Sequence, residues 1–198
     1  AAFIGEPIMG AGGVITPPEG YWKGVQQICR DNDILLIVDE VVTGFGRTGK
    51  NFASEHYGIK PDMMTTAKGI TAGVFPFSAA FISEEIYQVL RETHKDIGGF
   101  SHGYTYSGHP IGAAVANTVL DIMQREDLIE SAEKVGKYLH RRLAEVLFDH
   151  KNVGEIRGKG LLAAIQLVED SERKLFLDPT KKIAGKISEV CASIQCET

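Results

Sequence analysis

The sequence that decides the fold is Leu35-Leu36-Ile37-Val38-Asp39-Glu40-Val41-Val42-Thr43-Gly44-Phe45-Gly46-Arg47-Thr48-Gly49. It begins as an apolar run of strand length, stops at two adjacent carboxylates, and continues as a glycine-rich loop with one arginine. In an α/β protein, residues at the carboxyl end of a buried strand lie at the edge of the sheet where ligands bind. Asp39 is therefore the residue to which we relate the rest of the chain.

The composition is that of a globular protein. The chain has 198 residues, of which 43% are hydrophobic and 24% charged, so it can form one substantial core or a large domain with part of a second. A net charge of -5 gives no basic surface for nucleic acid or an anionic membrane. No apolar run has the length of a membrane span. The first and last residues fall within or just after structural patterns, which is typical of a fragment.

Cys29, Cys191 and Cys196 are odd in number and show no CxxC spacing. This pattern argues against a disulfide framework and against a zinc site, so we expect no metal. We expect reduced thiols and, as the default, a cytoplasmic location.

Two more charged residues follow strand-like runs. Glu6 comes after the apolar residues 1–4, and Lys68 comes after residues 63–66. Glu6 and Asp39 are 33 positions apart, and Asp39 and Lys68 are 29 apart. Each interval suits one strand, one crossover and the next strand, so all three side chains can meet at one edge of a parallel sheet. A buried ion pair is the structural alternative.

Periodicity predicts the remaining elements. Trp22 and Cys29 lie on the apolar face of a helix that packs on the sheet, and a smaller α+β unit begins near residue 150. The expected elements are a helix from residue 19, a buried strand at 76–83, a short helix at 84–92, an irregular loop at 98–110, helices at 111–124 and from 127, a break at 154–160, a strand at 161–168 and a helix at 181–195.

A lysine at a strand end can bind phosphate, act as a base, or form a Schiff base. The chain lacks a nucleotide P-loop, and the glycines at 10–13 do not fit the dinucleotide fingerprint. With these two nucleotide motifs excluded, the remaining role for Lys68 is a reaction with a carbonyl group. Asp39 would then be an anion that faces a cationic partner. Pyridoxal 5'-phosphate (PLP) needs a lysine for its aldehyde and a carboxylate for its pyridine nitrogen.

Four motifs together resemble the class III aminotransferases of PLP fold type I, and most of all the omega-aminotransferases that use pyruvate as acceptor. The motifs are Glu6-Pro7-Ile8-Met9-Gly10, the stretch from Asp39 to Gly49, Pro61-Asp62 to Lys68-Gly69, and His102-Gly103-Tyr104-Thr105-Tyr106-Ser107-Gly108-His109-Pro110.

The resemblance implies a role for each matched residue. Lys68 would form the aldimine with the cofactor and then carry the substrate proton. Asp39 would pair with the pyridine N1–H, and Val41 would pack on the ring face. Thr105 would reach the cofactor phosphate of the neighbouring subunit, and Glu6 would be an acidic gate near the substrate.

One position departs from the family pattern. Many class III members have glutamine where this chain has Val42, and that amide donates to the cofactor O3', which valine cannot do. The pyruvate-using branch tolerates an apolar residue here. We expect Arg47 to hold the turn, and we expect His56, His102 and His109 to have no catalytic role.

The resemblance also implies the fold and the domains. The fold would be α/β, with the mostly parallel sheet of a large domain, flanking helices, and part of a smaller α+β C-terminal domain. Residues 1–110 would be the C-terminal half of the large PLP-binding domain, residues 111–150 the connecting long helices, and residues 151–198 the beginning of the small domain.

The implied activity is PLP-dependent transfer of an amino group from an omega-amino acid, amine or diamine to a 2-oxo acid, expected to be pyruvate, by a ping-pong mechanism. The implied assembly is a homodimer or dimer of dimers with the active site at the interface. We expect the 198 residues alone to bind PLP poorly and to be inactive. A PLP decarboxylase, an aminomutase and a non-catalytic fragment remain as alternatives.

Overall fold

The computed structural model describes residues 1–100, 102–173 and 175–195. The chain divides into two compact units. The first comprises Ala1–His140 and Arg157–Ala163, and the second comprises Arg141–Ile156 and the described part of Ala164–Thr198. Each unit is described by itself. Cys196, expected to be a free thiol, lies outside the described residues.

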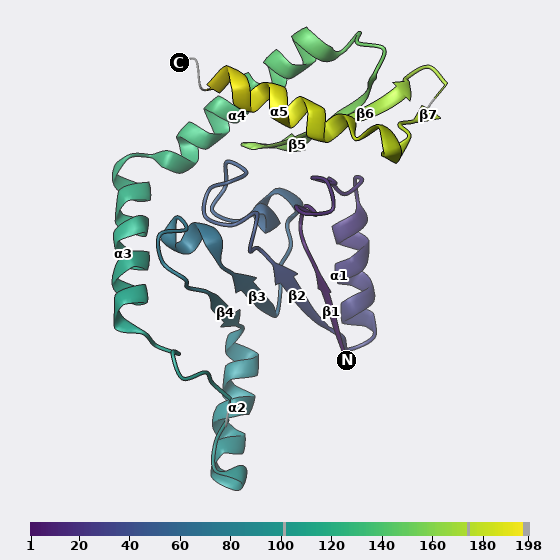
Figure 1. Ribbon diagram of the computed structural model, residues 1–198. Coiled ribbons are helices and arrows are strands. Elements are labelled where there is room, and N and C mark those ends of the chain that lie inside the picture. Colours follow the sequence, from purple (N-terminus) through teal and green to yellow (C-terminus); the bar gives the residue numbers. More distant parts are fainter. Residues whose placement is uncertain (101, 174, 196–198) are drawn as a thin grey trace. The chain divides into compact units, whose positions relative to one another are not determined.

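A four-stranded sheet forms the centre of the first unit, in the order β1 (Ala2–Gly5), β2 (Leu35–Asp39), β3 (Met63–Thr66) and β4 (Ala79–Ile82). The first three strands are parallel, and β4 is antiparallel to β3 (Figure 1). The registers pair Gly5 with Val38 and Asp39 with Thr65. The carboxyl ends of β1, β2 and β3 therefore lie at one edge of the sheet.

The helix α1 (Tyr21–Asp31) covers one face of this sheet. Its buried Trp22 and Cys29 pack with Leu36 and Val38 of β2, as the helical spacing predicts. The Trp22 Nε1–H also donates to the carbonyl of Pro7 at 3.2 Å, so the buried indole is satisfied. Since side chains alternate along a strand, Ile37 and Asp39 point to the face away from α1.

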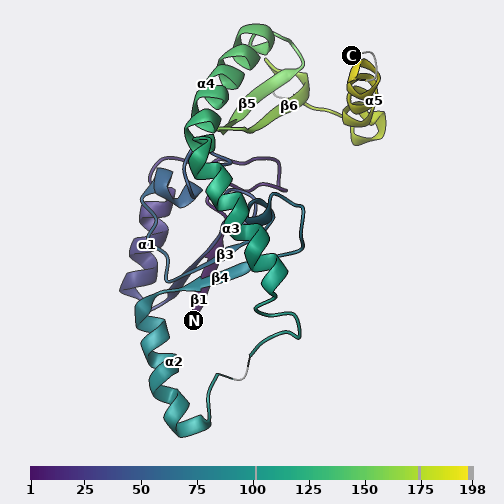
Figure 2. The same ribbon diagram turned by 90° about the vertical axis from the view of Figure 1, so that its left-hand side faces the viewer.

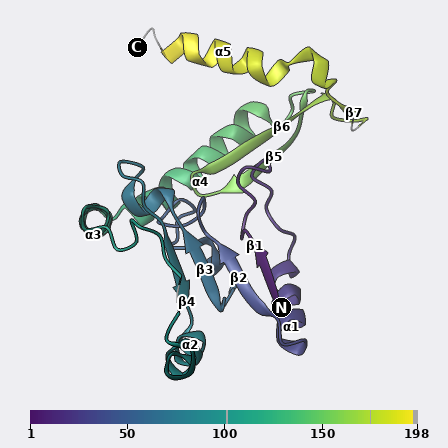
Figure 3. The same cartoon turned by 60° about the horizontal axis from the view of Figure 1, so that its bottom comes forward.

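The other helices of the first unit lie around the sheet. They are α2 (Glu84–Ile97), α3 (Pro110–Arg125), the part of α4 (Leu128–Leu147) up to His140, and the 3-10 helices η1 (Ala53–Tyr57) and η2 (Lys68–Thr71). The helix η1 ends at Tyr57, which packs with the core between α1 and β2. Figures 2 and 3 show α1 and α3 on opposite sides of the sheet. Contacts between α3 and η2 place α3 beside the segment that carries Lys68.

Two expectations for the first unit are wrong in detail. The strand expected to be buried at residues 76–83 is β4, whose Phe81 and Ile82 are 48% and 42% exposed, because it is the last strand of the described sheet. Ile4, in the apolar run before Glu6, is also 59% exposed, because α1 covers only the other face of β1. The helix expected at 84–92 continues to Ile97 (Figure 1).

The second unit is built on the antiparallel pair β6 (Leu162–Asp170) and β7 (Leu175–Phe176), with η3 (Pro179–Lys181) and α5 (Ile183–Gln195) following. The neighbouring strand of β6 is β5 (Val153–Lys159), where a break in structure was expected (Figure 3). The three glycines of residues 154–160 suggested a loop, yet pairing with β6 makes this segment a strand. Among the described residues, none of the helices combines the length and apolar character needed to cross a bilayer.

Candidate active site

Glu6, Asp39 and Lys68 all lie at, or just after, the carboxyl ends of neighbouring parallel strands. Glu6 is the residue after Gly5, which pairs with Val38, and Lys68 is three residues after Thr65, which pairs with Asp39. Because Asp39 and Thr65 are paired, their side chains point to the same face of the sheet, the one away from α1. The topology thus brings the two carboxylates and the lysine to one edge of the sheet.

Asp39 is half-buried at the last position of β2. Its Oδ1 accepts a hydrogen bond from the backbone N–H of Val41 at 2.9 Å. An ionised carboxylate has about four acceptor sites, so Asp39 can still accept a proton donor from a ligand. Val41 is tied to Asp39 through this bond, and its own side chain is half-buried.

Lys68 is the first residue of η2, and its side chain is exposed. Its φ angle is +46°, which is the left-handed region that residues with a side chain rarely adopt. Its carbonyl accepts from the N–H of Gly73 at 3.1 Å, which closes the turn. Such strained residues cluster at functional sites, because the surrounding structure has to hold them there.

Glu6 is held by the loop that follows β1. Its Oε2 accepts from the N–H of Gly10 at 2.9 Å. The loop closes on itself through two backbone bonds between Met9 and Ile15, of 3.1 and 3.0 Å. Gly10 also lies so close to Val42 that a Cβ placed on it would be 2.8 Å from Val42 Cγ1. Glu6 and Val42 therefore meet through one glycine.

Glu40 is a functional candidate that the sequence did not single out. It is fully buried, and its carboxylate accepts four hydrogen bonds, from Thr43 Oγ1, from the N–H of Ala53, and from both the N–H and the Oγ of Ser54. Thr43 three residues further on was the only local signal for this arrangement. The two donors from Ser54 come from a separate segment, which spacing does not predict.

Thr105 lies in the exposed connection between α2 and α3. It belongs to a tight turn in which the N–H of Ser107 donates to the carbonyl of Tyr104 at 2.9 Å. Figure 1 shows this connection at the lower end of α3, away from the carboxyl ends of the parallel strands. Within this chain, Thr105 does not join the group formed by Glu6, Asp39 and Lys68.

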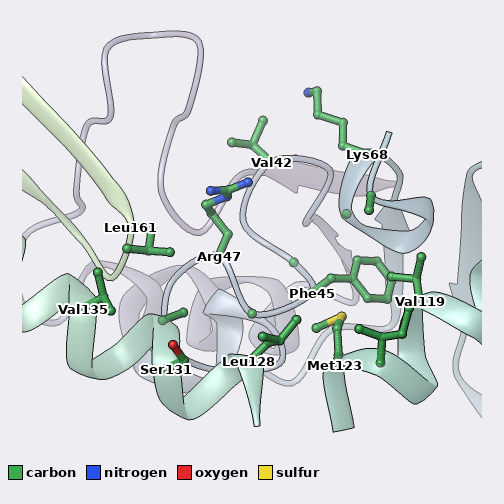
Figure 4. Close-up of a pocket in the computed structure, with 16 residues that line it drawn as sticks. Val42, Phe45, Arg47, Lys68, Val119, Met123, Leu128, Ser131, Val135 and Leu161 are labelled. Atoms are coloured by element: carbon green, nitrogen blue, oxygen red, sulfur yellow. The ribbon is translucent and has the colours of Figure 1, made fainter. Parts of the chain in front are cut away.

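A cavity of about 560 Å³ borders Lys68 on the side of α3. Figure 4 shows Phe45, Val119 and Met123 on one part of its wall and Leu161 with Val135 on another, while the Lys68 amine points away from Phe45. The wall is mostly apolar. The sequence did not predict this cavity, because α3 and α4 complete it.

The three histidines for which we expect no catalytic role, His56, His102 and His109, have separate surroundings. His56 lies in η1, where its Nε2 is 3.1 Å from both the carbonyl oxygen and the Oγ1 of Thr48. Burial, followed by the positive charges of Lys159 and Lys50, lowers the pKa of His56 below its ordinary value, against the opposite effect of the Thr48 bond. His102 is exposed, and His109 precedes α3. Their lack of a catalytic role stays a prediction.

The residues at the sheet edge fit PLP. The cofactor needs a primary amine for its aldehyde and an anion for its pyridine nitrogen. Lys68 supplies an exposed amine, and Asp39 supplies a carboxylate with acceptor sites left over. Both come from the ends of neighbouring strands, so the sheet fixes their separation.

Known aminotransferases are similar to this chain in sequence. A putrescine–pyruvate aminotransferase of Pseudomonas aeruginosa is 48% identical over 180 residues, which are 90% of this chain and 38% of that protein. A diaminobutyrate–2-oxoglutarate transaminase of Halomonas elongata is 44% identical over 188 residues, which are 95% of this chain and 40% of that protein. The chain thus spans about 40% of the length of these relatives.

A solved structure agrees with these relatives. The chain resembles an (S)-enantioselective omega-transaminase from Thermomicrobium roseum with a TM-score of 0.86 and 47% identity, over 92% of this chain and 40% of that one. The expected α/β architecture, fold type I of PLP enzymes, is confirmed. The family described as aminotransferase class-III matches residues 1–194. The chain therefore belongs to the class III aminotransferases, a family of PLP-dependent enzymes.

Proposed function

We propose that the protein containing this chain transfers an amino group from an omega-amino acid, amine or diamine to a 2-oxo acid by a ping-pong mechanism. One observation carries the proposal: in a class III chain, Asp39 pairs with Thr65 on the neighbouring parallel strand, and Lys68 follows Thr65 by three residues. The diamine-derived names of two relatives support an amino donor of this kind.

Each residue of the edge has a separate task. PLP supplies an electron sink when bound. Lys68 is the amine that holds the cofactor aldehyde and, once released, moves the proton that leaves the substrate carbon. Asp39 accepts the hydrogen bond of the protonated pyridine nitrogen, and Val41 packs against the ring. Glu6 is the acidic group beside the substrate, held in place by the Gly10 N–H.

The assembly is part of the same proposal. Thr105 is exposed and belongs to the connection between α2 and α3, which Figure 1 shows at the lower end of α3; this supports a role towards the cofactor phosphate of a second subunit in a homodimer. We assign residues 1–110 to the large PLP-binding domain, residues 111–150 to the connecting helices and residues 151–198 to the small domain. A cytoplasmic location stays a prediction from the cysteine content.

We propose pyruvate as the acceptor. Val42 supports this choice, because an apolar residue at this position resembles the pyruvate-using branch. The two named relatives differ, since one name contains pyruvate and the other 2-oxoglutarate. Initial rates with the two acceptors and a common diamine donor decide between them, and faster transfer to 2-oxoglutarate would overturn the choice.

The full-length protein tests the site through Lys68→Ala and Asp39→Asn. Wild type with PLP should show a visible absorption band, and reduction with borohydride should attach the cofactor covalently to the protein. Lys68→Ala should abolish this fixation, whereas Asp39→Asn should keep the cofactor and lose most of the turnover, because an unprotonated ring accepts electrons poorly. Borohydride fixation in Lys68→Ala would refute the role of Lys68. Release of carbon dioxide, or an amine moved within one molecule, would refute the transfer reaction.

A further inference from the structure

Glu40 follows Asp39 directly and is 0% exposed. Its Oε1 accepts from the Ser54 N–H at 2.7 Å and from the Ser54 Oγ at 2.5 Å. Its Oε2 accepts from the Ala53 N–H at 3.0 Å and from Thr43 Oγ1 at 2.5 Å. Four donors thus meet the roughly four acceptor sites of an ionised carboxylate, so the charged form is fully satisfied.

These donors come from two parts of the loop that follows β2. Thr43 lies in the turn directly after Glu40, and Ala53 and Ser54 begin η1. One side chain therefore fixes both the beginning and the end of the loop. Buried networks that are fully satisfied in this way hold a single arrangement, because any other arrangement leaves polar groups unpaired.

The backbone of Glu40 is fixed as well. Its N–H donates to the carbonyl of Thr65 at 2.9 Å, which adds one bond to the pairing of β2 with β3. Its carbonyl accepts from the N–H of Gly44 at 2.9 Å. Val41, the residue on the other side, donates its N–H to Asp39 Oδ1. The backbone of residues 40 and 41 therefore carries the donor that holds the Asp39 carboxylate.

From these contacts we propose that Glu40 is a positioning residue for Asp39. The buried Glu40 carboxylate fixes the turn that follows Asp39. This turn holds the Asp39 carboxylate and the Val41 side chain in place relative to β3, the strand that leads to Lys68. This inference rests on the proposed function of Asp39. It gives Glu40 no contact with substrate or cofactor.

Glu40→Gln is the sharpest test, because it keeps the shape and changes only the acceptors. Each carboxylate oxygen faces one backbone N–H, either of Ser54 or of Ala53. If the amide NH₂ of glutamine takes the place of either oxygen, it faces a backbone N–H that is also a donor. That buried N–H is then left unpaired. The turn at 40–44 should then sample other conformations while the rest of the first unit stays folded.

The matched control is Gln26→Leu. Gln26 is also a buried polar residue, and it accepts from the N–H of Lys60 at 2.9 Å and donates to the carbonyl of Gly58 at 3.3 Å. It therefore loses comparable buried hydrogen bonds without touching the turn after Asp39. Both variants are made in the full-length protein and studied well below their melting temperatures.

Three measurements are compared: hydrogen exchange of peptides covering residues 39–44 in the cofactor-free protein, the dissociation constant of PLP, and kcat with KM for the amino donor. In Glu40→Gln we expect exchange and the dissociation constant to rise about tenfold and kcat to fall about tenfold, with KM for the donor unchanged. Gln26→Leu should lower only the melting temperature. Equal behaviour of the two variants would overturn the proposal.

Variants that each remove one donor to Glu40 keep the test valid if Glu40→Gln fails to fold. Thr43→Val and Ser54→Ala each remove one hydroxyl and leave the carboxylate with three donors. Smaller changes in the same direction are expected, and unchanged exchange and kcat in both would overturn the proposal. A wild-type protein without a PLP band would refute the proposed function instead, and exchange at residues 39–44 would still report on Glu40.

Discussion

Gly10 and Val42 join the loop that holds Glu6 to the loop that follows Asp39. A Cβ on Gly10 would lie 2.8 Å from Val42 Cγ1, which is closer than real Cβ contacts come. Gly10 has no positive φ angle, so alanine would be strained by this contact and not by its backbone. We expect Gly10→Ala to cost about 1–3 kcal/mol in the free energy of unfolding and to displace the bond from Gly10 to Glu6.

A double-mutant cycle with Val42→Ala separates this contact from other effects of alanine. Removing two methyl groups from Val42 opens space for the new Cβ, so the double variant should recover most of the loss. Urea unfolding of the four full-length proteins gives the coupling free energy. Additive effects within about 0.3–0.5 kcal/mol would show that the two loops do not meet here.

The same residues show what could be read from the sequence at this scale. Asp39 and Lys68 were found because strand ends, spacing and the family motifs all pointed to them. The sequence does not distinguish Glu40, because it stands beside Asp39 in the same motif and its donors at Ala53 and Ser54 lie 13 and 14 residues away. Burial of a carboxylate among neutral donors depends on how a loop folds back, and no local pattern encodes that.

Arg157 connects an element late in the chain with the loop after β1. Its Nε–H donates to the carbonyl of Gly13 at 2.9 Å. A charged donor on a loop carbonyl restricts a segment that is otherwise rich in glycine. In Arg157→Met we therefore expect faster hydrogen exchange at residues 9–15 and a loss of about 1 kcal/mol in the free energy of unfolding.

Arg125→Met is the control for Arg157→Met. Arg125 is paired with Glu126 at 2.8 Å, and both side chains are at least half exposed. Exposed ion pairs contribute little, so the control should change neither exchange nor the free energy of unfolding measurably. Equal exchange of residues 9–15 in wild type and Arg157→Met would contradict this role of Arg157.

Sequence patterns predicted those helices and strands well whose buried residues recur at regular spacing or form a continuous apolar run. The stripe with Trp22 and Cys29 became α1, and the apolar run before Asp39 became β2. The prediction was wrong for β5, because Gly154, Gly158 and Gly160 indicate a loop. Pairing with β6 overrides that local preference, and Gly160 is needed at its turn, where a Cβ would lie 2.4 Å from the Thr48 carbonyl carbon.

At the scale of the whole chain, the order of strand ends and motifs was sufficient to predict the fold class. Parallel strands separated by crossovers allow few topologies, and four motifs in one order select among them. The division into units was harder to read. Residues 157–163 belong to the first unit although the chain around them belongs to the second, and such a return depends on contacts far apart in sequence.

His56 links the stability of the protein to pH. Burial and the charges of Lys159 and Lys50 lower its pKa in the folded state, so the unfolded state binds a proton first as the pH falls. The contribution of His56 to the free energy of unfolding is therefore complete above its ordinary pKa of about 6.5. It is lost as the pH falls through the lower pKa of His56 in the folded state. His56→Gln cannot titrate, while its amide can still donate to the Thr48 carbonyl.

Urea unfolding of full-length wild type and His56→Gln at pH 7.5 and 5.5 measures this linkage. The free energy of unfolding of wild type should fall more on acidification than that of the variant, because only wild type carries the imidazole that gains a proton on unfolding. Groups that titrate in both proteins cancel in the difference. Parallel losses in the two proteins would mean that His56 takes up its proton equally well in the folded state, against the burial and the two lysines that surround it.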